Sequence, residues 1–132
     1  MIQLEQVTKT YPKASRPSLD EVSVGSEKGE FVFFIGPSGS GKSTIIKLLL
    51  HEITPNKGKV MVNSKDVTSM RSWKIPNFRR SIGCVFQDFK LLENKTVREN
   101  VAFALEVIGK PRQVIDRTVP EVLELVGLAH KL

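Results

Sequence analysis

The residues best suited to chemistry lie in one loop, Gly36-Pro37-Ser38-Gly39-Ser40-Gly41-Lys42-Ser43, which follows the pattern G-x-x-x-x-G-K-S. Glycines let the backbone curl so that successive N–H groups point into one concavity that attracts anions. The Lys42 side chain can reach the terminal phosphates of a polyphosphate as a point charge, and the Ser43 hydroxyl can ligate Mg²⁺. The loop therefore predicts a site for a magnesium-bound polyphosphate.

Two apolar segments flank this loop and must position it. Phe31–Ile35 is a near-continuous apolar run of strand length, which is typical of a parallel strand covered on both faces. Thr44–Leu50 suits a buried helix, whose first-turn N–H groups and positive dipole end would add to an anion site. The order strand, loop, helix favours a phosphate site over a glycine-rich turn that only reverses the chain.

The remaining strands predicted by the sequence indicate a mixed α/β fold. Ile2–Thr8 and Leu19–Ser26 alternate apolar and polar residues, so both are expected to be half-buried strands, and Lys59–Val62 is a further strand. Ser81–Phe86 has the composition of a second buried strand, which would present Gln87 at its carboxyl end. Cys84, inside that strand, is expected to be a small buried apolar residue.

Three further helices are predicted after the one that follows the loop. A short one should follow Pro76. Thr96 and Glu99 form a capping box that opens a helix running to about Ile108, with a glycine as its stop. A further helical stretch is predicted over 111–126, and Pro120 should kink or divide it because proline removes a backbone hydrogen bond.

Composition narrows the class of protein. The 132 residues are 40% apolar and 26% charged, which is typical of a globular domain, and no run of eighteen apolar residues suggests a membrane span. The net charge is +6, and Arg71–Arg80 carries four cations with no acidic residue. We interpret this segment as a solvated face and expect no nucleic acid partner, while binding to nucleic acid or to an anionic membrane surface remains the alternative.

Three segments together resemble the ATP-binding domain of an ABC-type ATPase. Val7-Thr8-Lys9-Thr10-Tyr11 is similar to the family's A-loop, Gly36–Ser43 to its Walker A loop, and Val85-Phe86-Gln87 to its Q-loop. The resemblance implies that Tyr11 stacks on adenine and that the loop and Thr44 bind the phosphates of ATP. It also implies that Ser43 and Gln87 ligate Mg²⁺.

The resemblance implies a fold and a setting as well. The fold is an ABC-type P-loop NTPase fold of the α/β class, with an N-terminal antiparallel β portion and an incomplete core sheet. Glu30–Ser43, Ile82–Phe89 and Asn100–Lys110 are similar to the family's cell-division members. A protein of that kind is peripheral at the cytoplasmic face of the bacterial plasma membrane, associates with the membrane indirectly through an integral membrane partner, and homodimerises in its full-length form.

The chain departs from the family pattern in its second half. It contains no L-S-G-G-Q signature, no apolar strand ending in Asp-Glu, and no switch histidine after a late strand. We therefore expect residues 1–132 to be the N-terminal part of one ABC ATP-binding domain, which binds Mg-ATP but hydrolyses it poorly or not at all. A non-catalytic nucleotide-binding or adaptor role stays open. We also expect exposed apolar surface and marginal stability.

Overall fold

The computed structural model describes residues 1–131 of the chain. They fall into two compact units, Met1–Ile82 and the residues from Gly83 onward. The helices found in these residues are too short or too polar to cross a membrane.

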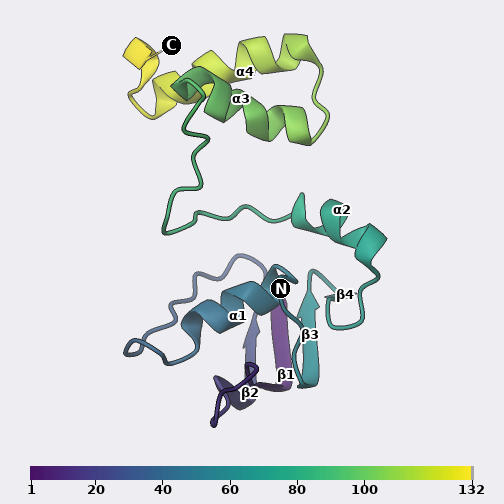
Figure 1. Ribbon diagram of the computed structural model, residues 1–132. Helices are drawn as coiled ribbons and strands as arrows, with labels where there is room; N and C mark the ends of the chain where they lie inside the picture. The colour runs from purple at the N-terminus through teal and green to yellow at the C-terminus, as the bar shows by residue number, and fades with distance from the viewer. Residues whose placement is uncertain (132) are drawn as a thin grey trace. The chain divides into compact units, whose positions relative to one another are not determined.

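The first unit is built on an antiparallel sheet of four strands (Figure 1). The strands are β1 (Ile2–Lys9), β2 (Leu19–Ser26), β3 (Lys57–Val62) and β4 (Lys65–Asp66). Their spatial order is β2-β1-β3-β4, so β1 pairs with β2 on one side and with β3 on the other. The predicted antiparallel β portion and its first two strands are confirmed.

The core of the first unit lies between this sheet and helix α1 (Lys42–Leu49), which crosses one face of it (Figure 1). Leu48 of α1 and both Leu4 and Val7 of β1 are at most 1% exposed. Strict alternation would turn Leu4 and Val7 to opposite faces, but the register of β1 shifts between them. The irregularity therefore lets both side chains enter the core that supports α1.

A 3₁₀ turn, η1 (Ser72–Lys74), leads into the short helix α2 (Ile75–Arg79). Pro76 lies in the first turn of α2, where a missing N–H is tolerated. Phe78 is 2% exposed and joins the core between the sheet and α1. The predicted short helix is confirmed, although it begins before Pro76 and not after it.

The prediction of buried strands at Phe31–Ile35 and Ser81–Phe86 is wrong for this structure. Both segments are irregular, and neither pairs with a strand anywhere in residues 1–131. Ile35 is 91% exposed and Val85 is 99% exposed, and Cys84 is exposed where burial was expected. A central strand exists only with hydrogen-bonding neighbours and cover on both faces, and the described part of the chain supplies neither.

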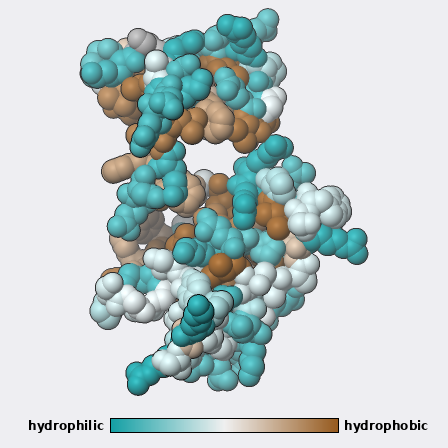
Figure 2. All heavy atoms as spheres, in the orientation of Figure 1, coloured by the Kyte–Doolittle hydropathy of each residue, from teal (hydrophilic) through white to brown (hydrophobic). Residues whose placement is uncertain are grey.

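Large apolar side chains consequently reach the surface. Figure 2 shows hydrophobic residues, in brown, exposed on both units. In the first unit Phe31 and Phe33 are 83% and 74% exposed and pack edge to face on each other, with ring centroids 4.8 Å apart. The expected exposure of apolar surface is confirmed, while the expected marginal stability stays a prediction.

The second unit is a pair of helices, α3 (Val97–Val107) and α4 (Arg112–Leu125), followed by the 3₁₀ turn η2 (Ala129–Lys131). Their small core consists of Ala102, Ile115, Val119 and Leu123. The capping box at the start of α3 is confirmed. The expected division at Pro120 is wrong, because α4 continues through it, and burial of the neighbouring residue Val119 at 0% exposure helps hold the helix together.

Candidate functional site

The glycine-rich loop ends at Gly41, which is the N-cap of α1 and has a φ of 90°. A side chain there would be strained, because this is the left-handed region that favours glycine. It would also collide, since a Cβ at Gly41 would lie 2.5 Å from the carbonyl oxygen of Ser18 and 2.7 Å from Cδ2 of Leu19. The start of α1 thus packs closely against the beginning of β2, and this contact fixes the position of the last residue of the loop.

Lys42 folds its side chain back across the loop. Its Nζ donates to the carbonyl oxygens of Gly36 and Pro37, both at 2.7 Å, and to Oγ of Ser40 at 3.1 Å. These bonds engage all three donors of the ammonium group. They hold the positive charge against the loop backbone.

The N-terminus of α1 is chemically suited to an anion. No side chain in the described residues caps it, and its first turn contains no acidic residue. The first-turn N–H groups and the positive end of the helix dipole are therefore free of a side-chain cap and of acidic neighbours in that turn. The residues from Gly36 to Ser40 are exposed, and so is Ser43, the predicted magnesium ligand. This donor set fits a magnesium-bound polyphosphate.

Tyr11 is tied to the helix that follows the loop. Its hydroxyl lies 3.3 Å from Oγ1 of Thr44, a side chain that is only 6% exposed. Nζ of Lys9 lies 5.9 Å from the centroid of the Tyr11 ring, and it donates to the carbonyl of Thr54 at 2.6 Å. The aromatic residue predicted to meet a base is thereby connected to the helix predicted to meet phosphates. The sequence did not predict this contact.

The far end of α1 has its own anchor, which the sequence also did not predict. Arg79 donates from Nε to the carbonyl of Leu50 at 2.9 Å and from Nη2 to the carbonyl of His51 at 3.0 Å. Cations stabilise helix C-termini by satisfying free carbonyl groups and the negative dipole end. Arg79 belongs to the segment that we interpret as a solvated face; it is exposed, and it also links the end of α1 to α2.

Gln87, the other predicted magnesium ligand, lies in the second unit. It is exposed and belongs to an irregular segment. Tyr11 and the loop from Gly36 to Thr44 thus belong to the first unit, and Gln87 belongs to the second. The joint role of Ser43 and Gln87 at magnesium stays a prediction. The described residues contain no cluster of three or more His, Cys, Asp or Glu suited to a metal ion.

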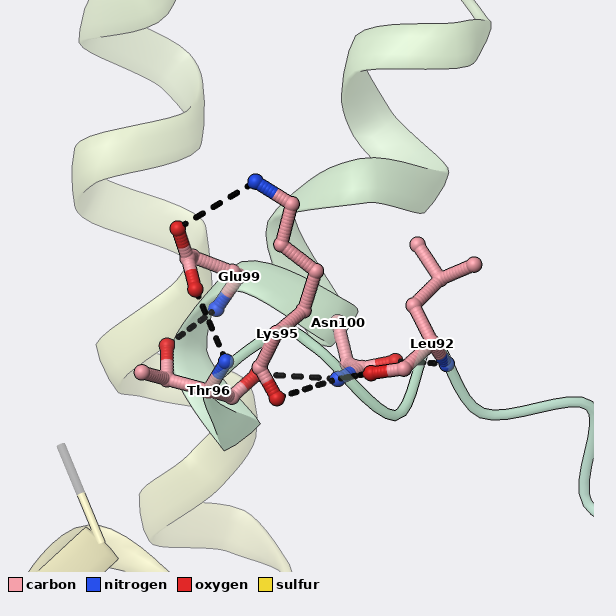
Figure 3. Close-up of polar contacts among 5 residues, drawn as sticks. All are labelled: Leu92, Lys95, Thr96, Glu99 and Asn100. Carbon is pink, nitrogen blue, oxygen red and sulfur yellow. Dashed lines mark hydrogen bonds and ion pairs between the residues drawn. The ribbon is translucent and has the colours of Figure 1, made fainter.

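A network around Asn100 organises the second unit (Figure 3). Oδ1 of Asn100 accepts from the Leu92 N–H at 2.8 Å, and Nδ2 donates to the carbonyls of Leu92, Lys95 and Thr96 at 3.2, 3.1 and 3.0 Å. One helical side chain thus fixes the segment that leads into α3. Asparagine inside a helix carries little sequence signal, which is why the pattern did not single it out.

Glu99 and Thr96 cap the same helix. The backbone N–H of Thr96 donates to Oε2 of Glu99 at 2.8 Å, and the Glu99 N–H donates to Oγ1 of Thr96 at 3.2 Å. The bond from the Thr96 N–H, assisted by Thr96's side chain and by nearby Lys95, holds the pKa of Glu99 below its ordinary value of 4.5.

Beside this network the second unit has an apolar groove with a volume of about 590 Å³. Its walls come from the segment before α3, from α3 and from the end of α4, and they consist of Leu91, Leu92, Glu93, Lys95, Val97, Asn100, Val101, Val122, Leu123, Val126 and Leu128. The Asn100 network therefore shapes one side of the groove.

Known proteins that resemble this chain belong to one family of ATP-binding cassettes. The family model of the ABC transporter matches residues 19–132, and the chain belongs to that family. Over 98% of its length the chain matches the solved structure of MJ0796, a bacterial ABC transporter cassette, with a TM-score of 0.84 and 32% identity, covering 57% of that chain. A second structure, the MJ0796 cassette bound to ADP and Pi, has a TM-score of 0.83 over 96% of this chain.

Within that family the chain is similar to the cell division ATP-binding protein FtsE. The FtsE of Mycobacterium tuberculosis is 58% identical over 131 residues, and that of Bacillus subtilis is 52% identical, each covering 99% of this chain. The methionine import ATP-binding protein MetN 2 of Rhodopseudomonas palustris is 44% identical over 131 residues. The chain spans 57% of the length of the FtsE relatives and 35% of that of MetN 2.

Proposed function

We propose that the chain binds Mg-ATP as the ATP-binding subunit of an FtsE/FtsX-like complex that acts in bacterial cell division. The observation that carries the proposal is the loop itself, where the Lys42 ammonium lies against the exposed loop and the N-terminus of α1 has no side-chain cap. The identity of 58% to an FtsE supports the cell-division setting over methionine import.

Each residue of the site has a proposed role. The loop N–H groups and Lys42 bind the β- and γ-phosphates, exchanging the bonds of Lys42 to the loop carbonyls for bonds to phosphate oxygens. Thr44 contributes from the first turn of α1, and Tyr11 stacks on adenine. Ser43 and Gln87 ligate Mg²⁺, which supplies positive charge to the phosphates.

The proposed partner is an FtsX-like integral membrane protein. The apolar groove of the second unit, with Leu91 and Leu92 in one wall, supports a contact with a helix of such a partner. The protein would then be peripheral at the cytoplasmic face of the plasma membrane, and the full-length form would homodimerise. The FtsE relatives that support this setting are longer proteins, and the chain spans 57% of their length.

We further propose that residues 1–132 form the N-terminal part of one ABC ATP-binding domain. On their own they bind Mg-ATP and hydrolyse it poorly or not at all, because none of them matches the signature or the Walker B carboxylates. The alternative is a non-catalytic nucleotide-binding or adaptor role, and hydrolysis by a longer form of the gene product would distinguish the two.

The experiment is a titration of the chain with a fluorescent ATP analogue in the presence of Mg²⁺. Lys42→Ala removes a charge-assisted bond to phosphate and should weaken binding by about 10- to 100-fold. Lys47→Ala is the matched control, because Lys47 is exposed in the last turn of the same helix. Affinity that survives both Lys42→Ala and Tyr11→Ala would show that the pocket is assigned wrongly.

A further inference from the structure

The net charge of the chain is concentrated in one segment. Residues 57–80 contain seven lysines and arginines and one acidic residue, so this segment alone carries the whole net charge of +6. Acidic and basic residues balance in the rest of the sequence. A charge imbalance confined to one segment produces a local positive surface and not a uniform charge over the protein.

The structure brings part of this charge, Lys65, Arg71 and Lys74, to one cavity of the first unit. The cavity has a volume of about 540 Å³ and is lined by Lys65, Asp66, Ser69, Met70, Arg71, Lys74, Asn77 and Phe78. It therefore brings together cations from β4, from η1 and from the loop between them. In Figure 1 β4 and α2 lie near each other in this unit.

The cations around the cavity are available to a ligand. Lys65 and Arg71 have no ion-pair partner within residues 1–131, and both are exposed. Arg79 is different, because its guanidinium is engaged with the carbonyls at the end of α1. The cations that can meet a ligand at this cavity are thus Lys65, Arg71 and Lys74, and Arg79 is not one of them.

Trp73 adds an amphipathic ring to this surface. It is 67% exposed, and Nζ of Lys74 lies 5.1 Å from the centroid of its ring. Tryptophan is enriched at the interface between lipid and water, where the ring sits at the level of the headgroups and adjacent cations meet anionic lipids. We name Lys65, Arg71, Trp73 and Lys74 the basic patch.

We propose that the basic patch binds directly to the surface of an anionic phospholipid bilayer, with its cations on the headgroup phosphates and Trp73 at the interface. This contact goes beyond the proposed function, because it requires neither nucleotide nor a protein partner. Nucleic acid fits less well. Trp73 is the only aromatic ring exposed on the patch, whereas single strands are bound by series of aromatic platforms, and α2 has only five residues to offer a duplex groove.

The expected affinity is modest and electrostatic. Each lysine or arginine near an anionic surface raises the affinity about fivefold, so the three cations of the patch together contribute about 100-fold. The effect falls off within the Debye length, about 10 Å at 0.1 M salt. Binding of this strength is reversible and would orient the protein on a membrane without anchoring it permanently.

The test is a titration of the 132-residue chain with phosphatidylglycerol vesicles, followed by the fluorescence of Trp73, which is the only tryptophan in the sequence. We expect a blue shift and saturable binding with phosphatidylglycerol, and neither with phosphatidylcholine. The double variant Arg71→Gln, Lys74→Gln should bind about 25-fold more weakly. The double variant Lys110→Gln, Arg112→Gln loses the same charge from the second unit and should bind within twofold of the unchanged chain.

Several outcomes would overturn the proposal. Failure to bind phosphatidylglycerol at low salt would do so, and so would equal losses in the two double variants. Binding that leaves the Trp73 spectrum unchanged would place the lipid contact elsewhere. Tighter binding to single-stranded DNA than to the vesicles would assign the patch to nucleic acid. Because the vesicle assay contains no nucleotide, its failure is distinct from a failure of ATP binding.

Discussion

Replacing Gly41 with alanine should destabilise the first unit far more than the same change at Gly39. Both residues have positive φ, 90° and 82°, so each alanine incurs about 1–2 kcal/mol of backbone strain. Only at Gly41 does the new methyl group collide with other atoms, 2.5 Å from the Ser18 carbonyl oxygen, whereas nothing lies within 4 Å of a Cβ at Gly39. Relieving that overlap costs about 1–3 kcal/mol more.

The assay is urea unfolding of both variants, followed by the fluorescence of Trp73, which lies in the first unit. Gly39→Ala should lower the free energy of unfolding by about 1–2 kcal/mol and Gly41→Ala by about 2–5 kcal/mol. Gly41→Ala should also weaken ATP binding, because the start of α1 must move away from β2. Equal destabilisation by the two variants would refute the close packing of the loop against Ser18.

Three further changes test other parts of the structure. Arg79→Gln removes the charge from the anchor of α1 and should lower the urea stability of the first unit by about 1–2 kcal/mol, whereas an unchanged midpoint would show that the anchor contributes nothing. Asn100→Ala removes the acceptor of the Leu92 N–H and should speed hydrogen exchange of that amide by at least about tenfold. Unchanged protection of the Leu92 amide would contradict the network. Because the folded pKa of Glu99 lies below 4.5, its stabilisation of α3 is complete above pH 4.5 and is lost as pH falls through that lowered value. Glu99→Gln should remove this pH dependence from the helicity of the second unit, measured by circular dichroism between pH 6 and pH 2.

Local sequence patterns predicted the elements whose stability depends on near neighbours. The alternation in Ile2–Thr8 and Leu19–Ser26 gave the correct strands because their partners, each other and β3, lie within the described chain. The capping box at Thr96 was equally predictable, since its hydrogen bonds close within four residues.

The apolar segments Phe31–Ile35 and Ser81–Phe86 show the limit of such patterns. Their composition is that of central strands, yet a strand is defined by the backbone groups beside it. Residues 1–131 offer them no pairing partner, and the side chains stay exposed. The predicted burial of Cys84 is wrong for the same reason, because the strand that was expected to bury it does not form. At Pro120 only the predicted division of the helix is wrong, because tertiary burial beside it outweighs the local cost of proline in α4. The predicted kink stays a prediction.

By itself, the sequence determined the chemistry of the loop. The spacing of two glycines, a lysine and a serine specifies N–H groups, a mobile cation and a hydroxyl around one anion, because these properties belong to residue types and to short-range backbone geometry. Only the tertiary structure decided what holds that loop in place. Ser18 packs against Gly41, Tyr11 bonds to Thr44, and Arg79 closes the far end of α1. These contacts join residues distant in the chain, so no local pattern encodes them.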